Sequence, residues 1–188
     1  MKYQGRHLPQ GKNKNESKPK HNFGAALKSV LGALIVAAAC AVLASTFLFS
    51  VLRIQGGSME PTLHEDELVI VLRTERFQPG DVIAFYYNNK ILLKRAIGSA
   101  GDWVDIDQAG SVSVNGENLY EPYVQTPSLG NGDVTLPFQV PDGRWFVLGD
   151  HRETSIDSRY SAVGTVSREQ VEGKVVFRIW PLSKFGAI

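Results

Sequence analysis

The chain has 188 residues, of which 43% are apolar and 21% are charged, and this composition excludes a wholly disordered or collagen-like protein. The formal net charge of +1 gives no general reason to expect nucleic-acid binding. The single cysteine excludes an intramolecular disulfide framework and a cysteine-based zinc cluster, and the length fits one ordinary domain with an additional segment.

The charges are unevenly distributed along the chain. Residues 1–28 hold seven lysines and arginines and one acidic residue, Glu16, whereas residues 53–188 hold thirteen basic and eighteen acidic residues. The N-terminal segment is also rich in Gly, Asn and Pro, which predicts a largely disordered tail over 1–28. A basic tail can bind nucleic acid, but a topology signal beside a membrane is the simpler interpretation, and we expect no nucleic-acid partner.

Residues 29–52 form an uncharged, mostly apolar run of 24 residues. As a helix this run would cover roughly 36 Å, enough to cross a lipid bilayer, and it predicts a transmembrane helix over 29–52. It is too long for the apolar core of a cleavable signal peptide, and Ala37-Ala38-Ala39-Cys40 only faintly resembles a lipoprotein cleavage site. Because the basic residues precede the run, we expect a single-pass protein of the plasma membrane with a cytoplasmic N-terminus and with residues 53–188 on the outer face.

Residues 53–188 contain short runs rich in β-branched and aromatic residues, separated by turn signals such as Asn88-Asn89, Asn115-Gly116 and Asp142-Gly143. No helical periodicity of useful length follows Leu52, and the Pro/Gly-rich stretch 125–139 predicts a long loop. The pattern predicts a mostly β domain, built as an antiparallel sheet that is sandwich- or barrel-like. The expected strands are 67–73, 81–87, 90–97, 103–106, 111–114, 144–148 and 175–180.

Two side chains in this domain are candidates for nucleophilic chemistry. Ser58 follows Gly56-Gly57, where the backbone can turn tightly and approach a ligand, although the same tripeptide also occurs in plain linkers. Lys94 shares one face of an expected strand with Leu92 and Ala96. Burial there would lower the pKa of its amine, and a neutral amine can serve as general base to a serine. The competing interpretation is an edge-strand lysine whose amine reaches water.

The segment 149–159 carries six ionisable side chains in eleven residues. Its alternating acids and arginines could form an ion-pair loop that buttresses a site. His151 could instead complete a Ser–His–Asp triad with Ser58, but the flanking residues match no signature of such enzymes. The two histidines after the apolar run and the scattered carboxylates have no metal-ligand spacing, so we expect neither a metal nor a cofactor. The four residues of the expected ion-pair loop are Asp150, Arg152, Asp157 and Arg159.

Taken together, these segments resemble type I signal peptidase, the bacterial leader peptidase family, in its short branch with one membrane span. The resemblance lies in four segments that follow an N-terminal anchor in the family's order. They are Ser58-Met59-x-Pro61-Thr62-Leu63, Gly80-Asp81-Val82-Ile83-Ala84-Phe85, Lys94-Arg95-x-x-Gly98-x-x-Gly101-Asp102 and Gly149-Asp150-x-Arg152-x-x-Ser155-x-Asp157-Ser158-Arg159.

The resemblance implies a signal peptidase/LexA-like fold and a serine endopeptidase that removes signal peptides from secretory precursor proteins after Ala-x-Ala-like sites. It implies a catalytic dyad in which Ser58 is the nucleophile and Lys94 the general base. Ser155 would hydrogen-bond the lysine and orient it, and the backbone N–H of Ser58 would stabilise the oxyanion. Ile54 and Leu93 match positions that line shallow pockets for small residues. Asp150, Arg152, Asp157 and Arg159 match a structural ion-pair network.

Two positions depart from the family's pattern. Gly56 stands where some members place a serine whose hydroxyl completes the oxyanion hole, and His151 stands where asparagine is common. Two other functions compete with the peptidase. A self-cleaving Ser–Lys protease of the LexA repressor group would need an Ala-Gly bond before its serine, and both Ala-Gly pairs here follow Ser58. A non-catalytic anchored β module would differ in showing no cleavage that depends on Ser58.

Overall fold

The structure is a computed structural model and describes residues 23–188, so the tail predicted over 1–22 lies outside the described residues. Helix α1 (Phe23–Leu48) carries the apolar run, and its stretch Leu27–Leu48 is long and apolar enough to cross a membrane. Ser45 and Thr46 donate their hydroxyl hydrogens to backbone carbonyls three residues earlier, which removes unpaired polar groups from the apolar helix. The apolar run predicted to form a membrane-spanning helix is therefore helical over most of its length.

The helix ends four residues before the apolar run does. Phe49–Leu52 belong to strand β1 (Phe49–Arg53), which pairs antiparallel with strand β2 (Leu68–Leu72). A run of apolar residues is compatible with both helix and strand. Here Phe49–Leu52 form a strand because β2 is available to pair with them. The expected helix over 29–52 thus begins earlier, at Phe23, and stops at Leu48.

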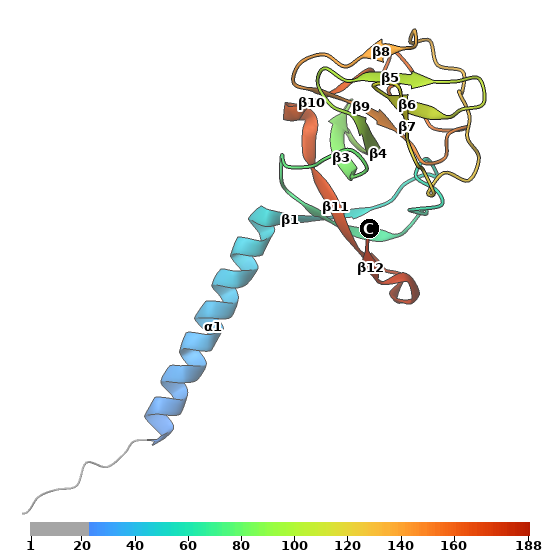
Figure 1. The fold of residues 1–188 in the computed structure, drawn as a ribbon. Coiled ribbons are helices and arrows are strands. Elements are labelled where there is room, and N and C mark those ends of the chain that lie inside the picture. The colour runs from blue at the N-terminus through green and yellow to red at the C-terminus, as the bar shows by residue number, and fades with distance from the viewer. Residues whose placement is uncertain (1–22) are drawn as a thin grey trace, which may run out of the picture. The chain divides into compact units, whose positions relative to one another are not determined.

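Residues 42–188 form one compact unit built of two antiparallel sheets (Figure 1). The large sheet has the strand order β1-β2-β11-β3-β4-β9-β10, with β12 paired to β11, and the small sheet has the order β7-β6-β5-β8. Two short 3₁₀ turns, η1 (Arg168–Gln170) and η2 (Leu182–Lys184), are the only helical turns described after α1 within residues 23–188. The remaining strands are β3 (Val82–Tyr87), β4 (Lys90–Gly98), β5 (Trp103–Ile106), β6 (Val112–Val114), β7 (Glu117–Asn118), β8 (Phe138–Gln139), β9 (Arg144–Leu148), β10 (Val166–Ser167), β11 (Val171–Trp180) and β12 (Gly186–Ala187).

The prediction of a mostly antiparallel β domain is confirmed, and all seven expected strands are present. Asn88 and Asn89 both have positive φ, 45° and 60°, as the two central residues of a tight hairpin turn between β3 and β4 require. Asn115 and Gly116 repeat this geometry between β6 and β7. The two-residue strands β7, β8, β10 and β12 were not predicted, because two residues are too few to show a period.

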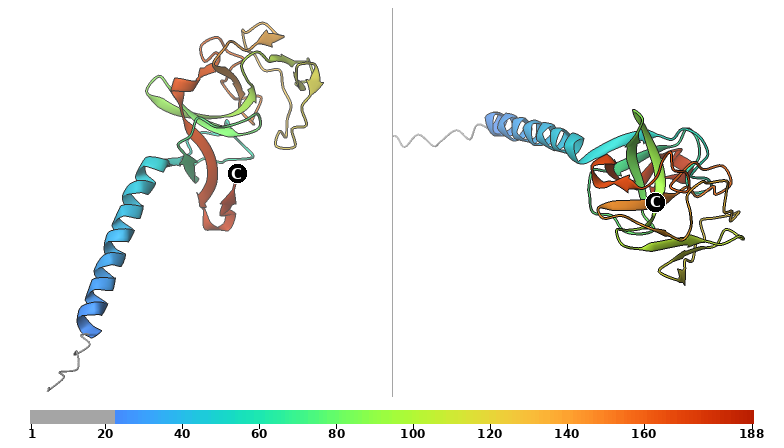
Figure 2. Two further views of the ribbon diagram at one scale, coloured as in Figure 1. Left: turned by 60° about the vertical axis from the view of Figure 1, so that its left-hand side comes forward. Right: turned by 90° about the horizontal axis from the view of Figure 1, so that it is seen from above.

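Three clusters of buried apolar side chains make the core, and they decide where the site lies. One cluster packs Ile54, Met59 and Leu63, from the segment after β1, against the large sheet. A second fills the space between the small sheet and the ends of β4 and β9, where the two sheets lie side by side in both views of Figure 2. The third lies among β3, β9 and β10, around Phe85 and Val147. The segment that bears Ser58 is therefore fixed by its own buried neighbours.

Candidate active site

Ser58 lies in the connection between β1 and β2, and this connection is held on both sides of the serine. Before it, Ile54 N–H donates to the Glu67 carbonyl at 2.9 Å, and after it, Leu63 N–H donates to the Met59 carbonyl at 2.9 Å. Met59 and Leu63 are buried in the core beside it. Ser58 is thus presented by an ordered turn, not by a flexible linker.

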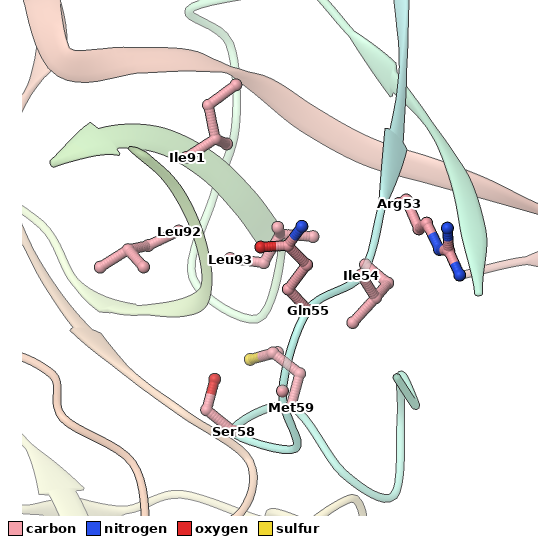
Figure 3. A pocket seen from close by; sticks show the side chains of 9 residues that line it. Arg53, Ile54, Gln55, Ser58, Met59, Ile91, Leu92 and Leu93 are labelled. Carbon is pink, nitrogen blue, oxygen red and sulfur yellow. The ribbon is translucent and has the colours of Figure 1, made fainter. Parts of the chain in front are cut away.

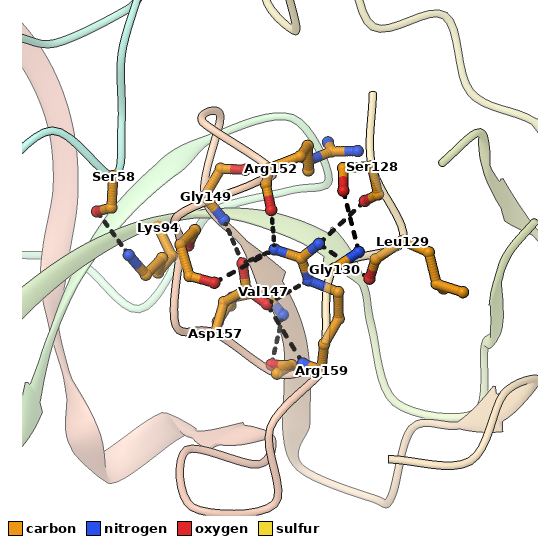
Figure 4. Close-up of polar contacts among 12 residues, drawn as sticks. Ser58, Lys94, Ser128, Leu129, Gly130, Val147, Gly149, Arg152, Asp157 and Arg159 are labelled. Carbon is orange, nitrogen blue, oxygen red and sulfur yellow. Dashed lines mark hydrogen bonds and ion pairs between the residues drawn. The ribbon is translucent and has the colours of Figure 1, made fainter. Parts of the chain in front are cut away.

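Lys94 comes from the middle of β4 and meets Ser58 directly. Its Nζ lies 2.6 Å from Ser58 Oγ, within hydrogen-bond distance, as Figure 4 shows. Only 3% of the lysine is exposed. The predicted burial of Lys94 is confirmed, and the interpretation in which its amine reaches water is wrong.

Burial also changes the acidity of this amine. Removal of Lys94 from water lowers its pKa to about 8, and the nearby Arg159 acts in the same direction, while the carboxylates of Asp157 and Asp150 partly oppose the change. A serine hydroxyl beside an amine that is substantially neutral near pH 8 can be deprotonated as it attacks a carbonyl.

The loop after β9 packs against the nucleophile from behind. His151 N–H donates to the Ser58 carbonyl at 3.1 Å, and Gly149 N–H donates to Asp157 Oδ2 at 3.0 Å. Ser155 is buried here, and its Oγ has no hydrogen-bond partner among the described residues. The structure therefore brings Ser155 to the site region without the hydrogen bond to Lys94 that the resemblance implied.

The expected ion-pair loop is only partly self-contained. Asp157 and Arg159 pair with each other through two contacts of 2.8 and 2.9 Å (Figure 4). Asp150 pairs instead with Arg95 on β4, at 2.8 and 2.5 Å, and also accepts a hydrogen bond from Thr62. Arg152 pairs with Glu121, which lies 31 residues earlier in the chain, at 3.0 and 2.6 Å. The four predicted residues are all buried, but two of them have partners elsewhere.

Sequence reasoning assigned no role to Arg95, Glu121 or Tyr123. The Arg95 guanidinium lies 3.8 Å from the centre of the Tyr123 ring, and the Tyr123 hydroxyl donates to Glu121 at 2.8 Å. Arg95 lies within the Lys94-Arg95 motif of the resemblance, and this motif is a signal by which sequence analysis could have singled it out. Glu121 and Tyr123 lie in an irregular segment, where no periodicity could have singled them out.

A small cavity of about 80 Å³ opens beside the nucleophile (Figure 3). Ile54 and Leu93, the two residues expected to line substrate pockets, both line it together with Ser58. A cavity of roughly 150 Å³ admits benzene, so about half that volume suits a methyl-sized group. The lining residues are Arg53, Ile54, Gln55, Gly56, Ser58, Met59, Ile91, Leu92 and Leu93.

A serine hydroxyl beside a buried amine is the arrangement of catalytic groups in a serine hydrolase that uses a lysine as its general base. A model of the family described as signal peptidase, peptidase S26, matches residues 27–180. Signal peptidase I of Bacillus licheniformis is 34% identical over 166 residues, covering 81% of this chain and 88% of that protein. Signal peptidase IB of Staphylococcus aureus is 38% identical over 159 residues, covering 74% and 82%. A crystal structure of a signal peptidase I from Enterococcus faecalis is similar with 34% identity and a TM-score of 0.44, covering 53% of this chain and 96% of that one.

The chain therefore belongs to the signal peptidase family, peptidase S26. It is a serine endopeptidase that removes signal peptides, and its substrates are precursor proteins. Among residues 23–188, one apolar helix is long enough to cross a membrane, and its place near the N-terminus is consistent with a membrane anchor.

Proposed function

We propose that the peptidase works through a dyad of Ser58 and Lys94. The observation that carries this assignment is the 2.6 Å contact between Ser58 Oγ and the amine of a lysine that is 3% exposed. The Ser58 oxygen attacks the carbonyl carbon of the scissile bond while neutral Lys94 takes the hydroxyl proton. The tetrahedral intermediate then breaks its C–N bond, and Lys94 gives the proton to the leaving amine. Lys94 next deprotonates a water molecule, which hydrolyses the acyl-enzyme and releases Ser58.

The backbone around the dyad supports this sequence of steps. Among residues 23–188 no group accepts a hydrogen bond from the Ser58 N–H, so it is free to donate to the oxyanion. Ser155 Oγ, buried and without a hydrogen-bond partner in the described part of the chain, is available to orient the Lys94 amine. Asp150, Arg152, Asp157 and Arg159 hold the surrounding loop and do not touch the reacting atoms.

The substrate enters this site as an extended chain with small side chains near the cut. Strand β4 is paired with β3 from Lys90 to Arg95, but its other edge is paired with β9 only from Arg95 onward. The edge over 90–94 is unpaired among the described residues, and an extended peptide can add to such an edge as a strand. A small residue of an Ala-x-Ala-like site would then occupy the cavity lined by Ile54 and Leu93.

The chain spans the plasma membrane once, with residues 1–28 in the cytoplasm, the apolar run 29–52 at the bilayer and the peptidase domain, 53–188, on the outer face. The excess of positive charge before α1 supports this orientation. The lipid bilayer is thus a second partner, and nucleic acid is not one. Trp180 and Leu182, apolar and exposed near the end of the chain, are suited to lie at a lipid surface.

Sealed right-side-out vesicles test the nucleophile and the orientation together. A synthetic Ala-x-Ala precursor peptide added outside should be cut immediately after the second alanine by vesicles that hold the wild-type chain. Ser58→Ala should abolish the cut, and Ser111→Ala, at an exposed serine away from the site, should leave it unchanged. Cleavage only after the vesicles are opened with detergent would overturn the orientation, and cleavage by Ser58→Ala would overturn the nucleophile.

The rate should rise with pH through about 8. Only the neutral amine of Lys94 can accept the serine proton, so below its pKa of about 8 the active fraction should fall about tenfold for each pH unit, and above it the rate should level off. The measurement is kcat/KM for a soluble peptide between about pH 6 and pH 10. A midpoint at the ordinary pKa of lysine, about 10.4, would contradict a buried, desolvated base.

A further inference from the structure

Two buried arginines flank the dyad, one next to Lys94 in sequence and one in the loop that packs behind Ser58. Arg95 follows Lys94 on β4, and Arg152 lies in the loop whose His151 N–H binds the Ser58 carbonyl. Arg152 is 1% exposed and also donates from Nε to the Gly149 carbonyl at 3.0 Å. Buried guanidinium groups need hydrogen-bonding or charged partners, because an unpaired charge in the protein interior is strongly destabilising.

One short segment supplies partners to both arginines. Glu121 accepts two hydrogen bonds from Arg152, and its side chain is 9% exposed. Two residues later, the Tyr123 ring packs against the Arg95 guanidinium, and the Tyr123 hydroxyl donates to Glu121. This segment, 121–123, comes from neither of the elements that carry the dyad.

We propose that Glu121 and Tyr123 are positioning residues that keep the Lys94 strand and the Ser58-binding loop in the spacing the reaction needs. The inference rests on the proposed dyad. Neither residue touches the reacting atoms, and both act through Arg95 and Arg152. Asp150, which Arg95 shares with Thr62 of the nucleophile segment, completes the connection between the two sides.

The connection has an electrostatic consequence at Lys94. Burial lowers the pKa of the Lys94 amine most, and of the nearby charges Asp157 and Asp150 raise this pKa while Arg159 lowers it. An Arg95 released from Tyr123 would neutralise Asp150 less well, so the pKa of Lys94 should move upward. Loss of the segment should therefore shift the pH profile toward alkaline values as well as slow the reaction.

The test compares Tyr123→Leu, Tyr123→Phe and Glu121→Gln in the full-length protein in detergent, with a soluble precursor peptide and with active sites counted. Tyr123→Leu should lower kcat about tenfold, leave KM unchanged because the cavity beside Ser58 is untouched, and move the midpoint of the pH profile upward. Tyr123→Phe keeps the ring over Arg95 and should restore most of kcat and the wild-type midpoint. Glu121→Gln should lower kcat with unchanged KM, since Arg152 loses its charged partner.

Matched controls come from the same stretch of chain. Tyr120→Leu alters a tyrosine that is 89% exposed, and Glu117→Gln alters an exposed glutamate, so both should behave as wild type. Wild-type kcat and midpoint in Tyr123→Leu would overturn the proposal even if fewer active sites are counted, because a smaller folded fraction lowers that count alone. A lower kcat with no change of midpoint would overturn it as well. Ser58→Ala and Lys94→Arg in the same assay report on the dyad separately. If they are inactive while Tyr123→Leu behaves as wild type, the dyad stands and the positioning role fails.

Discussion

Replacing Lys94 with arginine is expected to abolish cleavage while leaving the fold intact. Arginine stays protonated at every pH at which the protein is folded, so it cannot take the proton from Ser58 Oγ. The loss should be at least about a thousandfold in kcat, similar to the loss of a general base in other serine peptidases, and Lys94→Ala should be as severe. Single-turnover cleavage of a precursor peptide is the measurement.

The control for this variant is a lysine on another strand. Lys174 lies on β11 and pairs with Asp81 at 2.7 Å, a contact that an arginine can keep, so Lys174→Arg changes the same pair of residue types away from the site and should leave the rate near wild type. Turnover by Lys94→Arg within about tenfold of the wild-type rate would remove Lys94 as the base.

Gly149→Ala is expected to reduce activity by displacing the segment that carries Ser58. A Cβ atom at this position would overlap Ser155 Oγ and would lie 2.5 Å from the Ser58 carbonyl oxygen, so the loop and the nucleophile segment must separate. The cost should be about 1–3 kcal/mol of stability, typical of overpacking. Because displacement of a catalytic group by about 1 Å is expensive, kcat/KM should fall about a hundredfold.

Thermal unfolding and peptide cleavage of Gly149→Ala should be measured beside Gly186→Ala. A Cβ at Gly186 would meet no atom within 4 Å, and this glycine has no positive φ, so its variant should retain both stability and activity. Wild-type activity in Gly149→Ala would mean that the loop can yield without moving Ser58, which would contradict the tight packing described above.

The parts of the fold that were predictable depend on local patterns. The strand carrying Lys94 and the hairpin turn at Asn88-Asn89 follow from alternation and turn chemistry, which need only neighbouring residues. The pairing of Ser58 with Lys94 came from the ordered motifs of the resemblance, because 36 residues of chain separate them and no local rule joins them.

The features that were missed depend on contacts across the chain. The end of the helix at Leu48 is set by β2, which offers a strand partner to residues that would otherwise continue the helix. Pattern alone favoured ion pairs within the segment 149–159, whereas Arg152 pairs with Glu121 and Asp150 with Arg95, 55 residues earlier in the chain. From sequence alone, oppositely charged residues that are close along the chain are the obvious candidates for an ion pair. In the folded protein a buried charge pairs with whichever opposite charge the fold brings near it.

The unpaired edge of β4 has a consequence for the range of proteins that one such enzyme can process. A strand edge offers only backbone donors and acceptors, and these match the backbone of every extended polypeptide alike. In the proposed binding mode, discrimination between substrates is left to the small cavity beside Ser58, which has room for one small side chain. Signal sequences that differ at the other positions would then be cut alike, so one such peptidase could process many different precursors.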